Sequence, residues 1–429
     1  MTGQETAFGP ELRRRRVAAG LSQAQLAART HYTKGYLSKI ETGHKPPGPD
    51  LARRCDAVLD AEGELSALVS RPPPAASAED GATSGETWHI RLAPDGECRF
   101  LPATGAADDT TPLYLGPGGK GMGAAVREDH AARALTAFRV QFDQARRLGQ
   151  WAPPAAVLPT VITQTHTLRG LAAAAREPER GELLYLAARC AEFVGWMAQE
   201  ASDDRAALWW TRESVRMAAP TGSTVLEAYS LVRRAEIALY HDDAVQVIEL
   251  ARRARGRPGI PARIRGLAAQ REAQGHALYG DHDGCRRTLD QAAELLAAPP
   301  AAGANEPVIG SSTVANLNVV VTAWCLHELG RSEDAAELLD REVPLIPASA
   351  LRARLRFGAR RALAHASAGE IDQACLLGAE ILDHVDVVDS ATIRTDLRRL
   401  ARTLIRWQGQ GSVRELYPRL IAALHTGDA

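Results

Sequence analysis

Residues 22–43 read SQAQLAARTHYTKGYLSKIETG and contain two short helical patterns separated by a few polar residues. Ser22 and Thr33 stand at the start of the two patterns, where a side-chain oxygen can accept from an otherwise unpaired backbone N–H. Leu26 in the first pattern and Leu37 in the second fall on the inward face at helical spacing. The segment therefore predicts two amphipathic helices joined by a tight turn, which is a helix-turn-helix.

The second predicted helix carries Lys34, Tyr36, Ser38 and Lys39 on the face opposite its apolar side. In a helix-turn-helix the second helix enters the major groove of DNA, so such side chains can reach base edges. Residues 9–54 hold ten Lys and Arg against three acidic residues, a local charge of about +7, whereas the whole chain carries −1. This imbalance favours a nucleic-acid reader, the alternative being a merely solvated basic helix face.

Four short motifs carry a family resemblance over roughly residues 9–69, and they are Gly20-Leu21-Ser22-Gln23, Leu26-Ala27, Leu37-Ser38 and Ile40-Glu41-Thr42-Gly43. Together they resemble the XRE group of lambda-repressor-like DNA-binding domains. The resemblance implies a domain of five helices. On this sequence they are expected at 10–19, 22–30, 33–42, 49–59 and 62–69.

The same resemblance implies which residues touch DNA. Gln23 holds the position that braces a phosphate, and Lys34, Gly35 and Lys39 hold the base-reading positions. Gly35 departs from the family pattern, because it has no side chain with which to read a base. The full set expected at the DNA is Gln23, Thr33, Lys34, Gly35, Tyr36, Ser38, Lys39 and Lys45. The implied partner is double-stranded DNA with a palindromic operator, bound by a homodimer.

The length of 429 residues exceeds the usual range of a single domain. We expect an all-α protein with the DNA-binding domain at 1–70, a linker at 71–122 and a helical sensor and dimerisation domain at 123–429. Within the linker, apolar and polar residues alternate over 86–101 on both sides of a Pro-Asp-Gly turn signal. This pattern predicts a small β-hairpin.

The six cysteines are scattered without metal-ligand spacing, so we expect free thiols in a reducing cytoplasm and neither a metal nor another cofactor. The sequence shows neither a signal-peptide pattern nor an apolar run long enough to cross a membrane. Catalytic constellations do not emerge either, so the sequence predicts a cytoplasmic protein that is not an enzyme.

The C-terminal part is helical in pattern and repeats. Gly280, Gly330 and Gly369 each end a helix, a small residue follows five positions later, and an alanine stands seven positions earlier. Less regular copies run through 195–207 and 235–247. Repeated helix pairs with small residues at their crossings resemble tetratricopeptide (TPR) repeats, although the period near 39–40 exceeds the usual 34. The resemblance implies a right-handed helical solenoid with a concave groove.

Two helices of this part carry an aromatic–Arg–Glu–aromatic stripe with spacings of 4, 3 and 4, which places each set on one helix face. A stripe of this kind could line the groove and hold a ligand through arginine forks, or its Arg–Glu pairs could be ordinary surface ion pairs. The stripes lie 44 residues apart and the repeats 40, so the two are not equivalent positions. Together with a polar helix start, the candidate ligand residues are Tyr185, Arg189, Glu192, Trp196, Tyr229, Arg233, Glu236 and Asn316.

The sequence thus favours a DNA-binding transcription regulator, similar to the XRE–TPR regulators, whose repeats sense a peptide, a small molecule or a protein. A protein-interaction scaffold with an accessory DNA-binding head is the alternative, because repeat solenoids mostly bind proteins. An antitoxin-like autorepressor is a third interpretation that the length of the repeat region disfavours. Arginine far outnumbers lysine, and Ala, Gly and Pro are abundant, which indicates GC-rich coding and suggests an actinobacterial origin.

Overall fold

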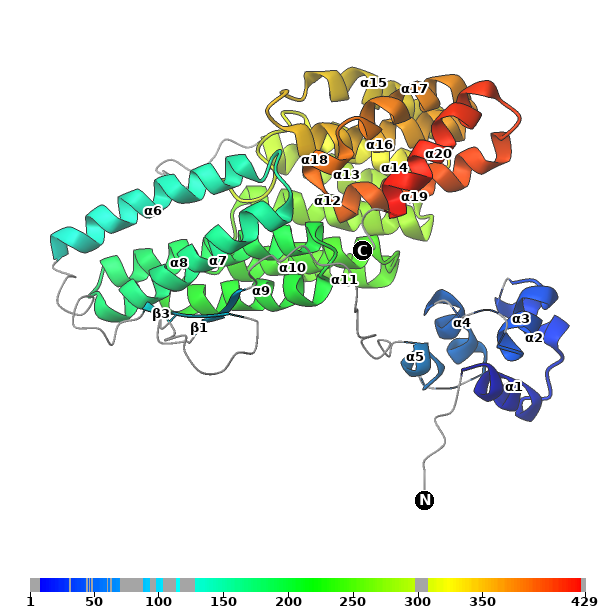
Figure 1. Ribbon diagram of the computed structural model, residues 1–429, viewed down its shortest axis with the longest axis horizontal. Coiled ribbons are helices and arrows are strands. Elements are labelled where there is room, and N and C mark those ends of the chain that lie inside the picture. Colours follow the sequence, from blue (N-terminus) through cyan, green and yellow to red (C-terminus); the bar gives the residue numbers. More distant parts are fainter. Residues whose placement is uncertain are drawn as a thin grey trace. The chain divides into compact units, whose positions relative to one another are not determined.

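The computed structural model divides the chain into two compact units, 1–85 and 86–429, which are described separately here (Figure 1). It describes residues 8–69 except 31, 44, 46, 48, 60, 62 and 63, then 88–92, 98–102, 113–115, 128–297 and 308–425. Both units are helical apart from one small sheet. The predicted linker at 71–122 lies outside the described residues except for three strands.

The N-terminal unit contains five helices, as the sequence predicts: α1 (Phe8–Ala18), α2 (Gln23–Thr30), α3 (Lys34–Glu41), α4 (Pro49–Leu59) and α5 (Glu64–Val69). Their boundaries differ from the predicted ones by two residues at most. One leucine from each helix is fully buried in a shared core, and these are Leu12, Leu26, Leu37, Leu51 and Leu65. This core fixes the angle between α2 and α3.

Both predicted N-caps are confirmed. The hydroxyl of Thr33 accepts a hydrogen bond from the backbone N–H of Tyr36 at 3.2 Å, at the start of α3. At the start of α2, the Ser22 hydroxyl accepts from the backbone N–H of Gln25 at 3.2 Å, while the Gln25 side chain accepts from the Ser22 N–H at 2.8 Å. This reciprocal pair is a capping box, so the turn is specified by local sequence.

A three-stranded antiparallel sheet begins the second unit. Strand β1 (Trp88–Leu92) pairs with β2 (Cys98–Pro102) so that Ile90 lies opposite Phe100. A third strand, β3 (Leu113–Leu115), adds to the other edge of β2. The alternating pattern at 86–101 covers the first two strands, and the third was not foreseen.

Most helices of the second unit pack on the next helix along the chain. The first part of the series comprises α6 (Glu128–Leu148), α7 (Pro154–Ala174), α8 (Glu179–Glu200), α9 (Asp204–Ala218), α10 (Val225–Tyr240), α11 (Ala244–Arg255), α12 (Ala262–Tyr279) and α13 (His282–Ala297). The second part comprises α14 (Leu317–Glu328), α15 (Ser332–Glu342), α16 (Leu351–Ala368), α17 (Ile371–Leu382), α18 (Val385–Val388), α19 (Ala391–Leu404) and α20 (Gly411–His425).

A left-handed residue marks the turn inside each successive helix pair. The predicted glycines have φ values of +79°, +80° and +91° at Gly280, Gly330 and Gly369. The earlier copies use Ser202 and Asp242 instead, with φ values of +68° and +55°. Ser202 and Asp242 lie 40 residues apart. The helix turns therefore repeat with the 40-residue spacing of the small residues, and not with the 44-residue spacing of the aromatic–Arg–Glu–aromatic stripes.

The small residues that the repeat predicts at the helix crossings are buried. Seven positions before each mark stand Gly195, Ala235, Ala273, Ala323 and Ala362, and five positions after it stand Ala207, Val247, Cys285, Ala335 and Ala374. A larger side chain would push the helices apart: a Cβ added to Gly195 would lie 3.2 Å from the carbonyl oxygen of Ala207. The repeat therefore has a packing cause.

The helical series returns on itself, because α19 packs against α8 although almost 200 residues separate them. Helix α16 packs against α19, and its side chains also contact α8 through Arg352–Glu200 and α10 through Arg356–Glu236. This return encloses the space between α8, α10, α12 and α16, where the polar residues described next are found.

Candidate nucleic-acid interface and interior cavity

Helix α3 presents the side chains that the sequence assigns to DNA. Lys34, Gly35 and Lys39 are exposed, while Tyr36 and Ser38 are half-buried. The opposite face of the helix is buried through Leu37 and Ile40. A Cβ added to Gly35 would meet nothing within 4 Å, so open space lies beside the helix there. The result is a short basic face that projects from a fixed core.

A buried ion pair holds the helices behind this face. Glu41, at the end of α3, accepts from Arg16 Nε at 2.5 Å and from Arg16 Nη2 at 2.9 Å. Burial alone would raise the pKa of Glu41, but the hydrogen bonds from Arg16 and Gln23 bring it below its ordinary value. Arg16 also donates to the Leu21 carbonyl at 2.8 Å, so one guanidinium links α1 to the turn and to α3.

Gln23 belongs to the same network, since its Nε2 donates to Glu41 at 2.8 Å. It stands at the first residue of α2, half-buried, where the resemblance expects a phosphate contact. The observed hydrogen bond fixes the orientation of the amide. The sequence analysis had not identified Arg16 and Glu41 as its partners.

Tyr36 and Lys45 contact each other rather than standing apart. The Tyr36 ring stacks on Tyr32 with ring centroids 5.1 Å apart, and the Lys45 ammonium lies 4.6 Å from the Tyr36 centroid. The backbone N–H of Lys45 donates to the Lys39 carbonyl at 3.2 Å. Because a cation over a tyrosine ring is attracted to it, this arrangement keeps Lys45 beside α3.

The second unit encloses a cavity of ≈ 150 Å³ that is lined by most of the predicted ligand residues. Arg189, Glu192 and Trp196 line it from α8, and Tyr229, Arg233 and Glu236 line it from α10. The two stripes therefore face the same space, one helical turn out of register. Tyr185 lies outside, in a separate surface pocket with Arg139 and Glu182.

Asn316 lies outside this cavity. Its side chain is exposed and donates to Glu342 at 2.9 Å, at the edge of α14. The nearby Asn318 packs between repeats, where it accepts from Gln270 at 3.2 Å. The polar start of α14 thus serves contacts between neighbouring helices.

The cavity lining contains seven arginines and three glutamates. The arginines are Arg146, Arg189, Arg233, Arg271, Arg352, Arg356 and Arg360. The sequence analysis missed five of these, which come from α6, α12 and α16. A signal was present on α16, because Arg352, Arg356 and Arg360 recur every four residues along one helix face.

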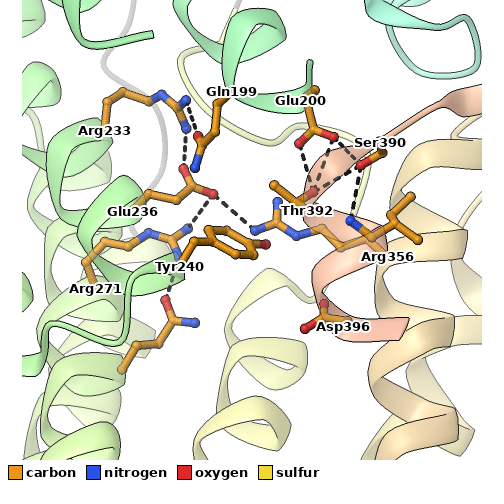
Figure 2. Close-up of polar contacts among 12 residues, drawn as sticks. Gln199, Glu200, Arg233, Glu236, Tyr240, Arg271, Arg356, Ser390, Thr392 and Asp396 are labelled. Carbon is orange, nitrogen blue, oxygen red and sulfur yellow. Dashed lines mark hydrogen bonds and ion pairs between the residues drawn. The ribbon is translucent and has the colours of Figure 1, made fainter. Parts of the chain in front are cut away.

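Glu236 is the point on which three of the arginines converge (Figure 2). Arg233 pairs with it closely, Arg356 Nη2 donates to it at 3.1 Å, and Arg271 lies 3.9 Å away. Burial alone would raise the pKa of this carboxyl, but the three guanidiniums hold it well below its usual range. The interpretation of Arg233 and Glu236 as a surface ion pair is therefore wrong, because both are buried.

Arg352 and Glu200 form a second buried group at the edge of the cavity. Arg352 donates to Glu200 at 3.0 Å and to the carbonyls of Gly149, Ala152 and Val388 at 2.8, 2.6 and 3.1 Å. Glu200 also accepts from the hydroxyls of Ser390 and Thr392, as Figure 2 shows. This group joins the end of α8 to α16 and α19, and it closes one side of the cavity.

Glu192 differs from the other two glutamates. It lines the cavity, and within the described part of the chain no hydrogen bond or ion pair to it is found. Burial raises its pKa above the ordinary value, and Arg189, Arg233 and Arg146 oppose that effect only in part. The residue is a carboxyl that faces the space without a fixed partner.

Residues 308–313 pass over the cavity as an irregular segment. Arg146 Nη2 donates to the Val308 carbonyl at 2.9 Å, and Arg263 donates to the carbonyls of Ile309 and Ser311 at 3.0 and 2.6 Å. Gly310 has φ +79°, and a Cβ there would lie 2.9 Å from Leu267. Arginines of α6 and α12 therefore hold this segment in place.

Comparison with known families agrees with the first unit. Residues 7–69 match a family model described as a helix-turn-helix domain. That match covers the five helices α1 to α5 and no part of the second unit. Searches among curated proteins and among solved structures found no match. The N-terminal unit is thus a helix-turn-helix domain, which supports DNA binding and regulation.

Two searches of the described residues gave negative results. None of the helices described is long and apolar enough to span a membrane. Across the same described ranges, no group of three or more His, Cys, Asp or Glu side chains is placed to hold a metal ion. Five cysteines there are buried free thiols, including Cys55 and Cys190.

Proposed function

We propose that the chain is a sequence-specific DNA-binding transcription regulator of the XRE type. Its first domain, about 1–70, reads the operator, and its helical domain, 123–429, senses an effector and mediates dimerisation. The observation that supports the proposal is the basic face of α3, with Lys34 and Lys39 exposed on the second helix of the helix-turn-helix, which is the helix that enters the major groove in such domains.

Recognition by α3 would combine two kinds of contact. Lys34 and Lys39 are five positions apart on α3, about one and a half turns, and both are exposed, so both can approach one stretch of major groove. Gln23 and Lys45 lie at the flanks, where phosphate contacts set the register of a helix-turn-helix on the duplex. Gly35 leaves one base position without a side-chain contact.

A homodimer on a palindromic operator follows from the way such domains bind, with half-sites about 34–36 Å apart. The cavity of the second unit supports effector sensing, because a concave space lined by apolar side chains and several arginines is typical of a small-molecule site. An effector can shift DNA affinity only by as much as it prefers one conformation over another. TPR-like packing of the helix pairs is part of the same proposal.

A titration of mixed-sequence duplex DNA against salt tests the DNA-binding role. For the wild-type chain, the logarithm of the binding constant should fall steeply with the logarithm of the salt concentration. Lys34→Ala with Lys39→Ala should lower that slope by up to about 2, because on mixed-sequence DNA, where no specific base contacts form, both ammonium groups are expected to lie against phosphates and each phosphate contact contributes about 1. Arg205→Ala on the exposed surface of α9 is the matched control.

Absence of DNA binding even at about 50 mM salt would reject the proposal and favour a protein-interaction scaffold. An unchanged slope in the double lysine variant would show that α3 is not the helix at the DNA. Sedimentation of the free protein and of its DNA complex tests the homodimer, which requires two chains per operator.

A further inference from the structure

The interior cavity has more arginine than its own acidic residues can neutralise. Seven arginines face three glutamates in its lining, and one of the glutamates, Glu192, has a raised pKa because it is buried. Isolated charges are costly to bury, so protein interiors usually pair them. Asp396 pairs with Arg360 from outside the lining and Asp143 lies 3.9 Å from Arg146, and the arginines still outnumber the acidic residues around the cavity.

Three of the arginines are held mainly by contacts within the fold, although Nε of Arg233 is buried without a hydrogen-bond partner. Arg352 donates to Glu200 and to three backbone carbonyls. Arg360 donates to Asp396 at 3.0 Å and to the Tyr240 hydroxyl at 3.3 Å. Arg233 is held by Glu236 and by the Gln199 side chain at 2.7 Å. These side chains brace α8, α10, α16 and α19, and they leave little donor capacity for a ligand.

Arg271 and Arg356 are different, because they share a carboxylate that Arg233 already occupies. Arg271 is only within 3.9 Å of Glu236, and its closest hydrogen bond is to the neutral side chain of Gln274. The Nε atoms of Arg271 and Arg356 are both buried without an acceptor, and so is Nε2 of Gln274. Buried donors nearly always have partners. The part of the cavity beside Arg271, Arg356 and Gln274, here called the arginine corner, therefore lacks a hydrogen-bond acceptor among the described residues.

A bound anion would supply the hydrogen-bond acceptor that the arginine corner lacks. A carboxylate or phosphate oxygen can accept from two guanidiniums at once, and such charge-assisted hydrogen bonds are stronger than neutral ones. Glu236 does not fill this role in the structure, because its oxygens accept from Arg233 and Arg356 while Arg271 lies 3.9 Å away, beyond hydrogen-bond distance. An acceptor from outside the described residues would complete the hydrogen bonding of these donors.

The remainder of the lining sets the size and character of the molecule. Phe193, Trp196, Tyr229 and Phe357 line the same space, together with Leu267 and Val321. The cavity volume of ≈ 150 Å³ equals that of an engineered protein cavity that binds benzene. An extended peptide is much larger than this, so the enclosed space favours a small molecule.

We propose that the cavity binds a small organic anion, a carboxylate or phosphate on an aromatic or aliphatic body, with Arg271 and Arg356 holding the anionic group. The apolar body lies against the aromatic side chains of α8, α10 and α16. The identification of this anion as the effector rests on the proposed regulatory function, but its binding does not.

Calorimetric titration of the full chain with three probes of similar size tests the proposal. Benzoate and phenyl phosphate carry the two candidate anionic groups, and benzyl alcohol is the uncharged control. We expect one or both anions to bind and benzyl alcohol to bind at least tenfold more weakly. The tighter of the two anions identifies carboxylate or phosphate as the preferred group.

Arg356→Gln and Arg271→Gln should each weaken anion binding about tenfold or more, because each removes a charged donor. Arg354→Gln is the matched control, since Arg354 is exposed on the same helix as Arg356. Each cavity variant leaves Glu236 with two of its three arginines, so the fold should survive, and the tryptophan fluorescence of the second unit verifies this.

Equal affinity for the anions and for benzyl alcohol, or no binding by any probe, would overturn the proposal. So would unchanged anion affinity in both cavity variants. The readout contains no DNA, whereas the salt titration of the lysine variants contains no anionic ligand. Failure of the anion site is therefore distinguishable from failure of the DNA-binding role.

Discussion

Replacing Arg352 with methionine should destabilise the second unit by about 4 kcal/mol. Arg352 is 3% exposed and its partner Glu200 is 1% exposed, so the change leaves a buried carboxylate without its counter-charge. Removing one partner of such a pair costs about 3–5 kcal/mol. The hydroxyls of Ser390 and Thr392 still bind Glu200, which places this part near the lower limit.

The rest of the cost comes from the backbone. The carbonyls of Gly149, Ala152 and Val388 lose a charged donor, and an unsatisfied buried acceptor costs about 1–3 kcal/mol. We count only about 1 kcal/mol for the three together, because water can enter the cavity beside them. Methionine has no charge and replaces most of the lost volume, so packing contributes little.

Urea unfolding followed by tryptophan fluorescence measures the change. All seven tryptophans lie between residues 88 and 407, so the signal reports the second unit and not the helix-turn-helix domain. Arg354→Met on the exposed side of α16 is the control and should change stability by less than about 0.5 kcal/mol. Adding Glu200→Gln to Arg352→Met should restore part of the loss, since no unpaired charge remains.

A loss below about 1 kcal/mol for Arg352→Met would refute the reasoning, because it would mean that Glu200 is not held as a buried ion. A double variant no more stable than Arg352→Met would also contradict it. In that case packing, and not the unpaired carboxylate, would cause the loss.

Three further predictions concern single side chains. Gly9→Ala should unfold the first unit, because the new Cβ would lie 2.4 Å from the Ile40 carbonyl oxygen. Gly35→Ala should instead stabilise the unit by up to about 1 kcal/mol, because alanine favours the helix and nothing lies within 4 Å of its Cβ. Amide hydrogen exchange of residues 8–69 measures both changes, and equal effects would contradict the packing of α1 on α3. Thr33→Ala should cost about 1 kcal/mol in the same assay, and unchanged exchange in α3 would show that the cap is dispensable. Glu192→Gln should raise the free energy of unfolding above that of the wild type at pH 8, because burial raises the pKa of Glu192 in the folded state and ionisation of this carboxyl therefore opposes folding. The difference between variant and wild type should vanish as the pH falls below the ordinary glutamate pKa. A difference that does not depend on pH would show that ionisation of Glu192 is not its cause.

Local signals in the sequence were sufficient for the first unit. Ser22 and Thr33 cap α2 and α3 through bonds to residues three positions away, so a short window contains both partners. The crossings of the second unit were visible for the same kind of reason. A left-handed residue and two small residues recur at fixed spacing, and close helix packing requires them.

The cavity could be predicted only in part, because its contacts join distant residues. The stripes on α8 and α10 are visible within single helices, but Glu236 meets Arg356, which is 120 positions away in the sequence. Arg271 and Glu200 belong to no visible pattern, since their partners lie on other helices. Asn316 is visible in the sequence as a polar residue at a helix start, but its contact with Glu342, 26 positions away, is not.

Selection of genomic DNA fragments by the purified full-length chain, at about 150 mM salt, tests the central claim most directly. The account predicts that the wild type enriches one palindromic sequence, with half-sites about one helical turn apart. Lys34→Ala with Lys39→Ala should abolish that enrichment, each lost base contact costing about 1–3 kcal/mol. Fragments no more enriched than random DNA, or the same palindrome recovered by the double variant, would contradict the claim that α3 reads an operator.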